Sequence, residues 1–144
     1  MISWSDLSAS VATAVRERRI GRPVCLRLHV LGLPADADLP ALSAELLTDC
    51  SRWFDERLER VEYRPTGPHA TAVGEGADGA VLLVCLHAQG DGPTRADLWL
   101  VGVQGTLHFD VGEALHLPSG EPSPAVHRAL LNSHSQHAPA AVPF

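Results

Sequence analysis

The stretch TAVGEGADGAVLLVCL, residues Thr71–Leu86, decides how the centre of this chain folds. It holds Gly74, Gly76 and Gly79 in the spacing G-x-G-x-x-G, and Asp97 follows about twenty residues later. This is the spacing of loops that bind the pyrophosphate of a dinucleotide such as NAD. Such a loop works only when a helix follows the glycines, because the free N–H groups at the start of that helix bind the phosphates.

The residues after these glycines predict a strand, not a helix. Ala80–Leu86 is a short apolar run, rich in β-branched residues, that ends at the turn signal Gly90–Pro93, which indicates a buried strand. His69–Val73 is a second strand candidate, and Asp78-Gly79 is a favoured hairpin dipeptide because both residues tolerate a positive φ. We therefore predict that the segment from Gly74 to Gly79 connects a β-hairpin. We also predict that neither NADH nor NADPH binds and that the chain uses no cofactor.

The composition indicates one cytoplasmic domain. A chain of 144 residues with 45% hydrophobic content is long enough for one domain with a core. The net charge is −6 and the 11 basic residues are scattered arginines, which disfavours a nucleic-acid partner. No apolar run approaches the roughly 20 residues of a membrane helix, and the N-terminal segment MISWSDLSAS has no signal-peptide pattern. Three cysteines without a C-x-x-C pair, namely Cys25, Cys50 and Cys85, predict reduced core thiols.

Outward from the glycine stretch, the periodicity of apolar residues predicts an α+β fold. We expect a mainly antiparallel sheet of about five to six strands with two helices packed on one face. Residues 1–117 form this domain, and residues 118–144 follow as a proline-rich connection, a short helix through Leu131 and a weakly specified tail. The expected helices run from Ser3 or Ser5 towards Gly21 and from the N-cap Asp38 to Phe54. The expected strands are Val24–Leu31, Leu58–Arg64 (ended by Pro65–Pro68), His69–Val73, Ala80–Leu86, Ala96–Val103 and Thr106–Asp110, the last two joined at Gln104-Gly105.

Three segments resemble one protein family in the family's own order. Ile20–Val24 (IGRPV) resembles a junction at which a helix ends and the first sheet strand begins. Leu46–Phe54 (LLTDCSRWF), followed by Val61, resembles a helix in which an aspartate precedes an Arg-Trp pair. Leu100–Asp110 (LVGVQGTLHFD) resembles a late hairpin of pattern G-x-x-G-x-Leu-x-Phe-Asp. Over residues 15–110 the chain is thus similar to the C-terminal domain of the glucose-fructose oxidoreductase and inositol dehydrogenase (Gfo/Idh/MocA) family, without the Rossmann domain.

The departures from the family pattern bear on activity. Family enzymes commonly carry a proton-transferring histidine three positions before the helix aspartate, and this chain has Leu46 there. Asp49 keeps its place but lacks a partner that titrates near neutral pH. The resemblance also implies a nucleotide domain with a catalytic lysine, whereas this chain contains no lysine. We therefore expect no hydride transfer by this chain alone, and we assign no residue a catalytic role.

Two groups of residues are candidates for binding. Asp49 and Arg52 could line a ligand pocket, as the resemblance implies, or form a surface ion pair. Strand parity could bring Cys25, His29, Cys85 and His87 together, with His108 from a third strand, as metal ligands or as a thiol beside a base. The plainer interpretation is a set of half-buried cysteines and histidines on a mixed sheet face, so no metal is assigned. His29 and His87 also remain ligand-binding candidates, while His127, His134 and His137 are expected to be solvated.

Three hypotheses of function follow. The first is a stand-alone non-catalytic module that forms a homo-oligomer through a sheet face, or binds a small polar ligand or a partner protein. The resemblance implies the sheet face as the contact, because in the family the outer face commonly pairs subunits. The second is a subunit or fragment of a two-part NAD(P)-dependent oxidoreductase whose Rossmann domain is a separate protein. The third is a small metal- or thiol-dependent enzyme that uses the Cys/His positions.

Overall fold

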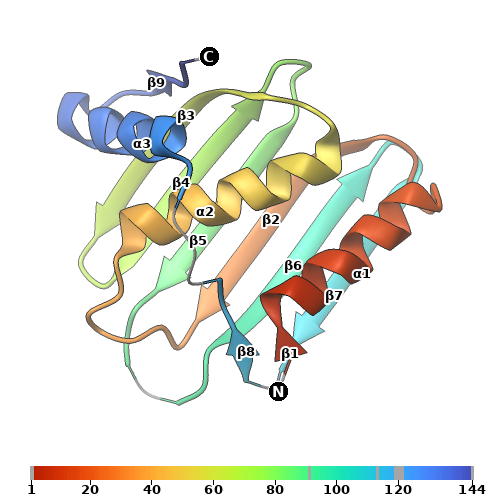
Figure 1. Cartoon of the computed structure of the whole chain (residues 1–144), viewed down its shortest axis with the longest axis horizontal. Helices are drawn as coiled ribbons and strands as arrows, with labels where there is room; N and C mark the ends of the chain where they lie inside the picture. Colours follow the sequence, from red (N-terminus) through yellow and green to blue (C-terminus); the bar gives the residue numbers. More distant parts are fainter. Residues whose placement is uncertain (1, 91, 113, 119–121, 144) are drawn as a thin grey trace.

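A single large sheet dominates the computed structural model (Figure 1). The structure describes residues 2–90, 92–112, 114–118 and 122–143; Asp91 of the predicted turn and residues 119–121 of the predicted connection lie outside this range. The strands are β1 (Ile2–Ser3), β2 (Pro23–Leu31), β3 (Leu58–Thr66), β4 (His69–Gly76), β5 (Val81–His87), β6 (Arg95–Gly102), β7 (Gly105–Val111), β8 (Leu115–His116) and β9 (Ala140–Ala141). The helices are α1 (Trp4–Arg16), α2 (Leu39–Ser51) with the 3-10 turn η1 (Arg52–Phe54), and α3 (Pro124–Gln136).

The sheet has the strand order β7-β6-β2-β5-β4-β3-β9. Two strands in its middle, β2 and β5, pair in parallel, and the other neighbouring pairs of this sheet, as far as the structure describes it, are antiparallel. A parallel pair needs a long crossover connection, and here the chain between β2 and β5 passes through α2 and the β3–β4 hairpin. The predicted α+β fold with a mainly antiparallel sheet is therefore confirmed. β1 and β8 form a separate short parallel pair.

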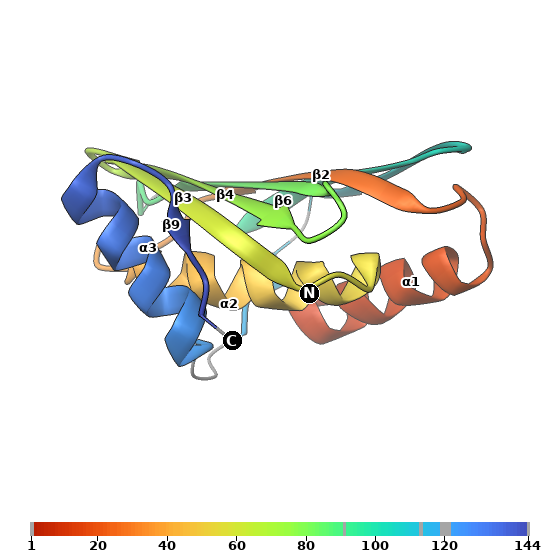
Figure 2. The same ribbon diagram turned by 90° about the horizontal axis from the view of Figure 1, so that it is seen from above.

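All three helices cover the same face of the sheet. Figure 2 shows the sheet as one layer with α1, α2 and α3 beneath it and no element above it. The strand positions that face the helices are apolar and buried, such as Leu28 in β2 and Val84 in β5. The helices bury Val11, Leu46 and Leu47 against them. The alternation of buried and half-exposed residues along β2 and β5 follows from this arrangement, because successive side chains point to opposite faces.

The starts of α1 and α2 each have a cause in the sequence. Ser3 caps α1, since its Oγ accepts a hydrogen bond from the N–H of Asp6 at 3.1 Å. Asp38 caps α2 in the same way through the N–H of Ala41 at 3.2 Å, with Pro40 in the first turn. Among the described residues, no helix is both long and apolar enough to cross a membrane.

The extent of the fold differs from the prediction. The sheet has seven strands where about five to six were expected, and three helices pack on it where two were expected. The added elements come from the end of the chain, because α3 packs on β3 and continues past Leu131 to Gln136, and β9 pairs with β3. Residues in this segment gave a weak pattern because α3 is mostly polar and β9 has only two residues.

Two turns also lie elsewhere than predicted. β3 runs through Pro65 to Thr66, which is possible because β9 pairs only with Arg60 and Val61 and leaves the outer edge of β3 free there. The β6–β7 turn is formed by Val103 and Gln104, while Gly105 already belongs to β7.

Candidate functional site

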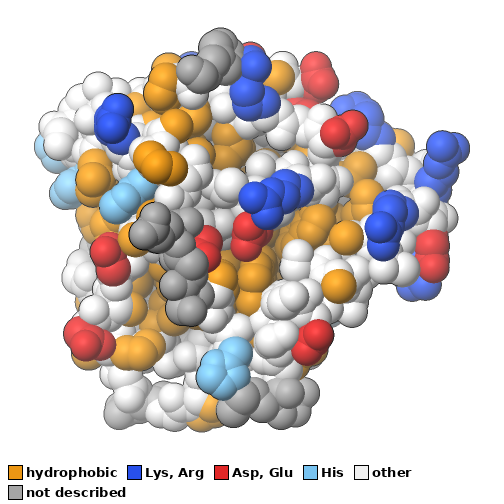
Figure 3. Space-filling view, in the orientation of Figure 1, with side chains coloured by type: hydrophobic (Ala, Val, Ile, Leu, Met, Phe, Trp, Pro, Cys, Tyr) orange, Lys and Arg blue, Asp and Glu red, His pale blue; other side chains and the backbone are white. Residues whose placement is uncertain are grey.

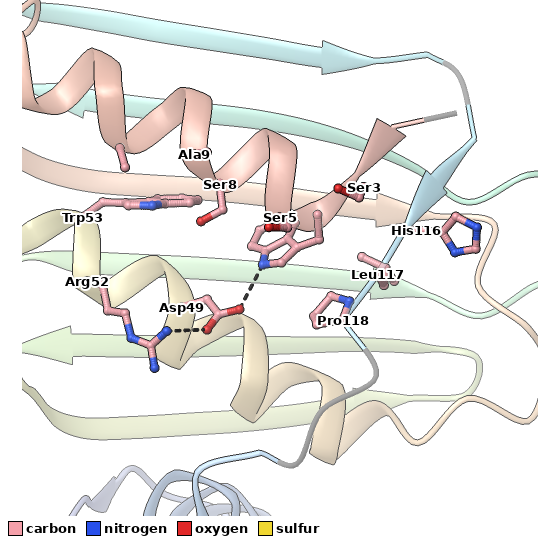
Figure 4. Close-up of a pocket in the computed structure, with 12 residues that line it drawn as sticks. Ser3, Ser5, Ser8, Ala9, Asp49, Arg52, Trp53, His116, Leu117 and Pro118 are labelled. Carbon is pink, nitrogen blue, oxygen red and sulfur yellow. Dashed lines mark hydrogen bonds and ion pairs between the residues drawn. The ribbon is translucent and has the colours of Figure 1, made fainter.

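A pocket of about 700 Å³ opens on the helix-covered side, between α1, the end of α2 and residues 116–118. We call it the Asp49 pocket (Figure 4). Figure 3 shows this side of the molecule, where apolar side chains are exposed between α1 and α2 and charged groups surround them. The lining residues are Ser3, Trp4, Ser5, Ser8, Ala9, Ala12, Asp49, Arg52, Trp53, His116, Leu117 and Pro118.

Asp49 lies on the last turn of α2 and holds two donors. Its Oδ2 accepts a hydrogen bond from the indole Nε1 of Trp4 at 2.9 Å, and its Oδ1 accepts one from Nη1 of Arg52 at 3.2 Å (Figure 4). The Asp49 side chain is 22% exposed, whereas Arg52 is 73% exposed. Asp49 and Arg52 thus line a pocket and also form an ion pair with each other, while a role in ligand binding stays a prediction. The exposed ion pair itself contributes little stability.

Two tryptophans form the apolar part of the pocket wall. The ring centroids of Trp4 and Trp53 lie 6.1 Å apart with 37° between the ring planes, and both residues are buried. Trp4 was missed in the sequence analysis because its contact with Asp49 spans 45 positions and has no local signal. Leu46 is fully buried in the core, so this position provides neither a titrating group nor a pocket-lining one.

The face of the sheet opposite the helices has no covering element (Figure 2). We call it the open sheet face; it consists of the outward-pointing side chains of β2–β7. Four of the exposed large apolar residues lie on it: Leu31 at 36%, Val81 at 40%, Trp99 at 40% and Val101 at 36% exposure. Val81 and Val101 both lie opposite Cys25 at one end of β2, and Trp99 follows on β6, whereas Leu31 lies at the other end of β2 opposite Arg95. Exposed apolar side chains gathered on one surface are typical of an interaction site.

The strand register brings some of the predicted Cys/His group together. β2 and β5 are neighbours, as the parity argument assumed, and His29 lies opposite Cys85. His29 and His87 have ring centroids 6.4 Å apart. Cys25 lies opposite Val81, four positions along β5 from Cys85, and does not join this group. Within the described residues, no three or more His, Cys, Asp or Glu side chains are arranged to hold a metal ion.

His108 belongs to a different pair. Its Nε2 lies 2.5 Å from Oδ1 of Asp97, and its ring stacks on Trp99 with centroids 3.9 Å apart and 12° between the planes. The residue that does join His29 and His87 is His69, whose ring centroid lies 4.3 Å from that of His87. The hairpin register could have predicted this contact, because His69 begins β4 and pairs with His87 at the end of β5.

Burial lowers the pKa of both His29 and His87 below the ordinary histidine value. For His29 the guanidinium of Arg27 lowers the pKa further, and Nε of Arg27 donates a hydrogen bond to Nε2 of His29 at 3.0 Å. For His87 the second cause of the lowered pKa is His69. For both rings these causes favour the neutral form, although Asp97 raises the pKa of His29 as the smallest of its causes.

The glycine stretch forms a hairpin turn, but only Gly79 serves the turn itself. Gly79 has φ +92°, whereas Gly74 and Gly76 lie inside β4. The N–H groups of this turn already have a carboxylate partner. Oε1 of Glu56 accepts hydrogen bonds from the N–H of Asp78 at 2.8 Å and from the N–H of Ala80 at 3.4 Å. Peptide groups that would face a phosphate in a dinucleotide loop therefore bind a side chain of this chain.

Comparison with known proteins places the fold. No protein-family model matches the sequence, and no curated protein matches it significantly. Among solved structures, a probable dehydrogenase from Thermotoga maritima matches 94% of this chain and 61% of its own, with TM-score 0.70 and 14% identity. Myo-inositol dehydrogenase from Lactobacillus casei, in complex with NAD(H) and myo-inositol, matches 95% of this chain and 59% of its own, with TM-score 0.72 and 10% identity. A myo-inositol dehydrogenase from Corynebacterium glutamicum matches 95% and 61%, with TM-score 0.66 and 13% identity.

These matches confirm the fold that the family resemblance implied. The structural neighbours are dehydrogenases of the predicted oxidoreductase type, and this chain spans only about three fifths of their length. At such low identity the likeness shows the fold alone.

Proposed function

We propose that this chain is a non-catalytic module with the fold of an oxidoreductase C-terminal domain, and that it self-associates through the open sheet face. The observation that supports this function is the set of exposed apolar side chains on that face, namely Leu31, Val81, Trp99 and Val101, on a surface that no helix covers. In the resembling family the corresponding face pairs subunits. A cytoplasmic location remains a prediction.

The size of the face is adequate for a stable dimer. Six strands of about seven residues cover on the order of 25 by 25 Å, given the usual strand spacing and rise per residue. A specific interface buries about 800 Å² of accessible surface on each partner. The accessible area of such a face is comparable, because protruding side chains expose more surface than a flat sheet of the same dimensions. Burial of apolar side chains then stabilises the dimer by roughly 25 cal/mol per Å² before the entropic cost of association is subtracted.

The non-catalytic part of the proposal is supported by the surroundings of Asp49. Its two partners are an indole N–H and a guanidinium, neither of which exchanges a proton near neutral pH. Leu46 is in the core, where the family commonly has its histidine. The glycine turn is bonded to Glu56.

Light scattering after size exclusion, together with sedimentation at micromolar protein, tests the self-association. We expect the wild type to form a dimer or larger assembly at pH 7.5 and the variant Trp99→Ala to weaken association at least tenfold. The matched control is Leu131→Ala, because Leu131 is 44% exposed, close to the 40% of Trp99, but lies on α3. A strictly monomeric wild type at these concentrations would contradict the proposal, as would equal effects of the two substitutions.

A second candidate is a ligand-binding subunit of a two-part NAD(P)-dependent oxidoreductase. The Asp49 pocket favours it, because a half-buried carboxylate, a guanidinium, serine hydroxyls and two indole rings suit a polyol or another small polar ligand. A neighbour of 10% identity was solved with NAD(H) and myo-inositol, and about two fifths of that protein has no counterpart here.

Calorimetric titration with myo-inositol tests the pocket directly. If the pocket binds this polyol, Asp49→Asn should weaken binding at least tenfold, because the amide cannot accept both hydrogen bonds that the carboxylate accepts. Asp55→Asn is the control, since Asp55 lies beyond η1, outside the pocket, in a left-handed conformation that asparagine tolerates. Co-purification of a separate Rossmann-domain protein would support the two-part enzyme. Failure of both experiments would leave this candidate without support.

A further inference from the structure

Three histidines from three neighbouring strands meet at one end of the open sheet face. They are His29 on β2, His87 on β5 and His69 on β4, and we call them the histidine cluster. The His69 and His87 rings are in edge contact with centroids 4.3 Å apart, and the His29 ring lies 6.4 Å from that of His87. The cluster borders the exposed apolar side chain of Leu31, which follows His29 on the same strand face.

The charged groups around the cluster act on its protonation in opposite directions, since Arg27 lowers the pKa of His29 and Asp97 raises it. On β2 the nearest is Arg27, whose guanidinium donates to His29. On β6, Asp97 lies opposite His29 and Arg95 lies opposite Leu31, but the carboxylate of Asp97 is bonded to His108.

On the other side of the cluster the neighbouring groups are neutral or already paired. Cys85 on β5 and Thr71 on β4 lie opposite each other beside His29 and His87. On β3, Thr66 pairs with His69, and Arg64 is bonded to Glu62. Among the described residues of these strands, Asp97 is the carboxylate opposite the cluster, and one carboxylate cannot compensate three protonated rings.

The hydrogen bond of the His29 ring also favours its neutral form. Nε2 of His29 accepts the hydrogen bond from Arg27, so protonation at this nitrogen would replace a bond with a repulsion. Nδ1 of His69 is buried without a hydrogen-bond partner. Burial lowers the pKa of His29 and His87 even in the single chain. A second copy on the same face would remove more water from these rings and lower each pKa further.

We infer that the histidine cluster makes self-association through the open sheet face depend on pH, so that neutral histidines permit it and protonated histidines prevent it. This inference rests on the proposed function. In a two-fold dimer each copy contributes one histidine cluster to the interface. Protonation would therefore bury two sets of charges, which doubles the free-energy cost. Since association lowers the histidine pKa, it is strongest above the ordinary histidine value of about 6.5 and weakens as the pH falls below it.

Sedimentation at pH 7.5 and pH 5.5 over a range of protein concentrations tests this inference. For the wild type we expect the dimer Kd to rise at least tenfold from pH 7.5 to pH 5.5, which corresponds to the uptake of about one proton per copy on dissociation. The variant with His29→Gln, His69→Gln and His87→Gln should keep nearly the same Kd at both pH values. His127→Gln is the matched control, because His127 lies on α3, and it should retain the wild-type pH dependence.

The outcomes separate the two proposals. Association at pH 7.5 with an unchanged Kd at pH 5.5 would overturn the histidine inference and leave the proposed function intact. The same conclusion would follow if the triple glutamine variant kept the wild-type pH dependence of Kd. Absence of association at pH 7.5 would overturn both. Circular dichroism at pH 5.5 must show that the dissociated wild type remains folded, and unfolding at that pH in place of dissociation would also count against the inference.

Discussion

Single residues decide why the glycine stretch is a turn and not a phosphate loop. Gly79 needs its positive φ of +92°, with no neighbouring atom within 4 Å of the position that a Cβ would occupy. Gly76 has an ordinary φ, but a Cβ there would collide with the carboxylate of Glu56. The same stretch thus uses glycine for two reasons, backbone freedom at one position and space for a side-chain carboxylate at the other.

These two reasons predict different responses to substitution. Gly79→Val should lower the free energy of unfolding by about 1 kcal/mol or more, because a β-branched residue is strained at positive φ. Gly76→Ala should also destabilise the domain, since it displaces Glu56 from the N–H groups of Asp78 and Ala80. Gly112→Val is the control, because Gly112 has neither a positive φ nor a neighbour within 4 Å. Chemical denaturation measures all three variants.

The turn also bears on cofactor binding. If Glu56 occupies these N–H groups, calorimetric titration should detect no binding of NADH to the wild type. Saturable binding in the low micromolar range, weakened by Gly76→Ala with little change in stability, would contradict the hairpin interpretation and would reopen the dinucleotide one.

At the scale of elements, the sequence predicted those helices and strands that have a periodic apolar pattern or a local start signal. The strands β2 and β5 alternate or run apolar between clear turn signals, and Ser3 and Asp38 mark helix starts, so these elements were found. The contact of Trp4 with Asp49 was not predicted, because residues far apart in the chain leave no periodic signal.

The end of the chain was underestimated for a similar reason. α3 is mostly polar, and its attachment depends on Ser133, whose buried hydroxyl accepts a hydrogen bond from the N–H of Tyr63 at 3.0 Å. β9 leaves this part of β3 unpaired, since it reaches only Arg60 and Val61. Ser133 therefore replaces a strand partner. It continues the buried face formed by Val126, Ala129 and Leu130, but its polar side chain hid this face in the sequence.

Ser133→Ala should destabilise the protein by about 1–3 kcal/mol, because it leaves the buried N–H of Tyr63 without an acceptor. Ser135→Ala, at an exposed position of α3, should change the free energy of unfolding by less than about 0.5 kcal/mol. Urea denaturation of the two variants measures the difference. Equal stabilities would show that water or a shifted helix replaces the lost acceptor.

On the scale of the whole molecule, the sheet separates two surfaces of different character. One face is covered by the helices and carries the Asp49 pocket at its margin, and the other is open and exposes Leu31, Val81, Trp99 and Val101. The three cysteines differ in burial according to the surface on which they lie. Cys50 belongs to α2 and is fully buried, whereas Cys25 and Cys85 are half-buried on the open sheet face.

The rate of thiol alkylation therefore measures which face is covered in solution. Burial, and next the carboxylate of Asp49, raise the pKa of the Cys50 thiol, so iodoacetamide should not modify Cys50 until the protein unfolds. Cys25 and Cys85 should react at low protein concentration at pH 7.5 and should become protected as the concentration rises through the dimer Kd. Mass spectrometry of tryptic peptides resolves the sites, and Trp99→Ala should move the onset of protection to higher concentration. Rates at Cys25 and Cys85 that do not change with concentration would show that the open sheet face is not the one that a second copy covers.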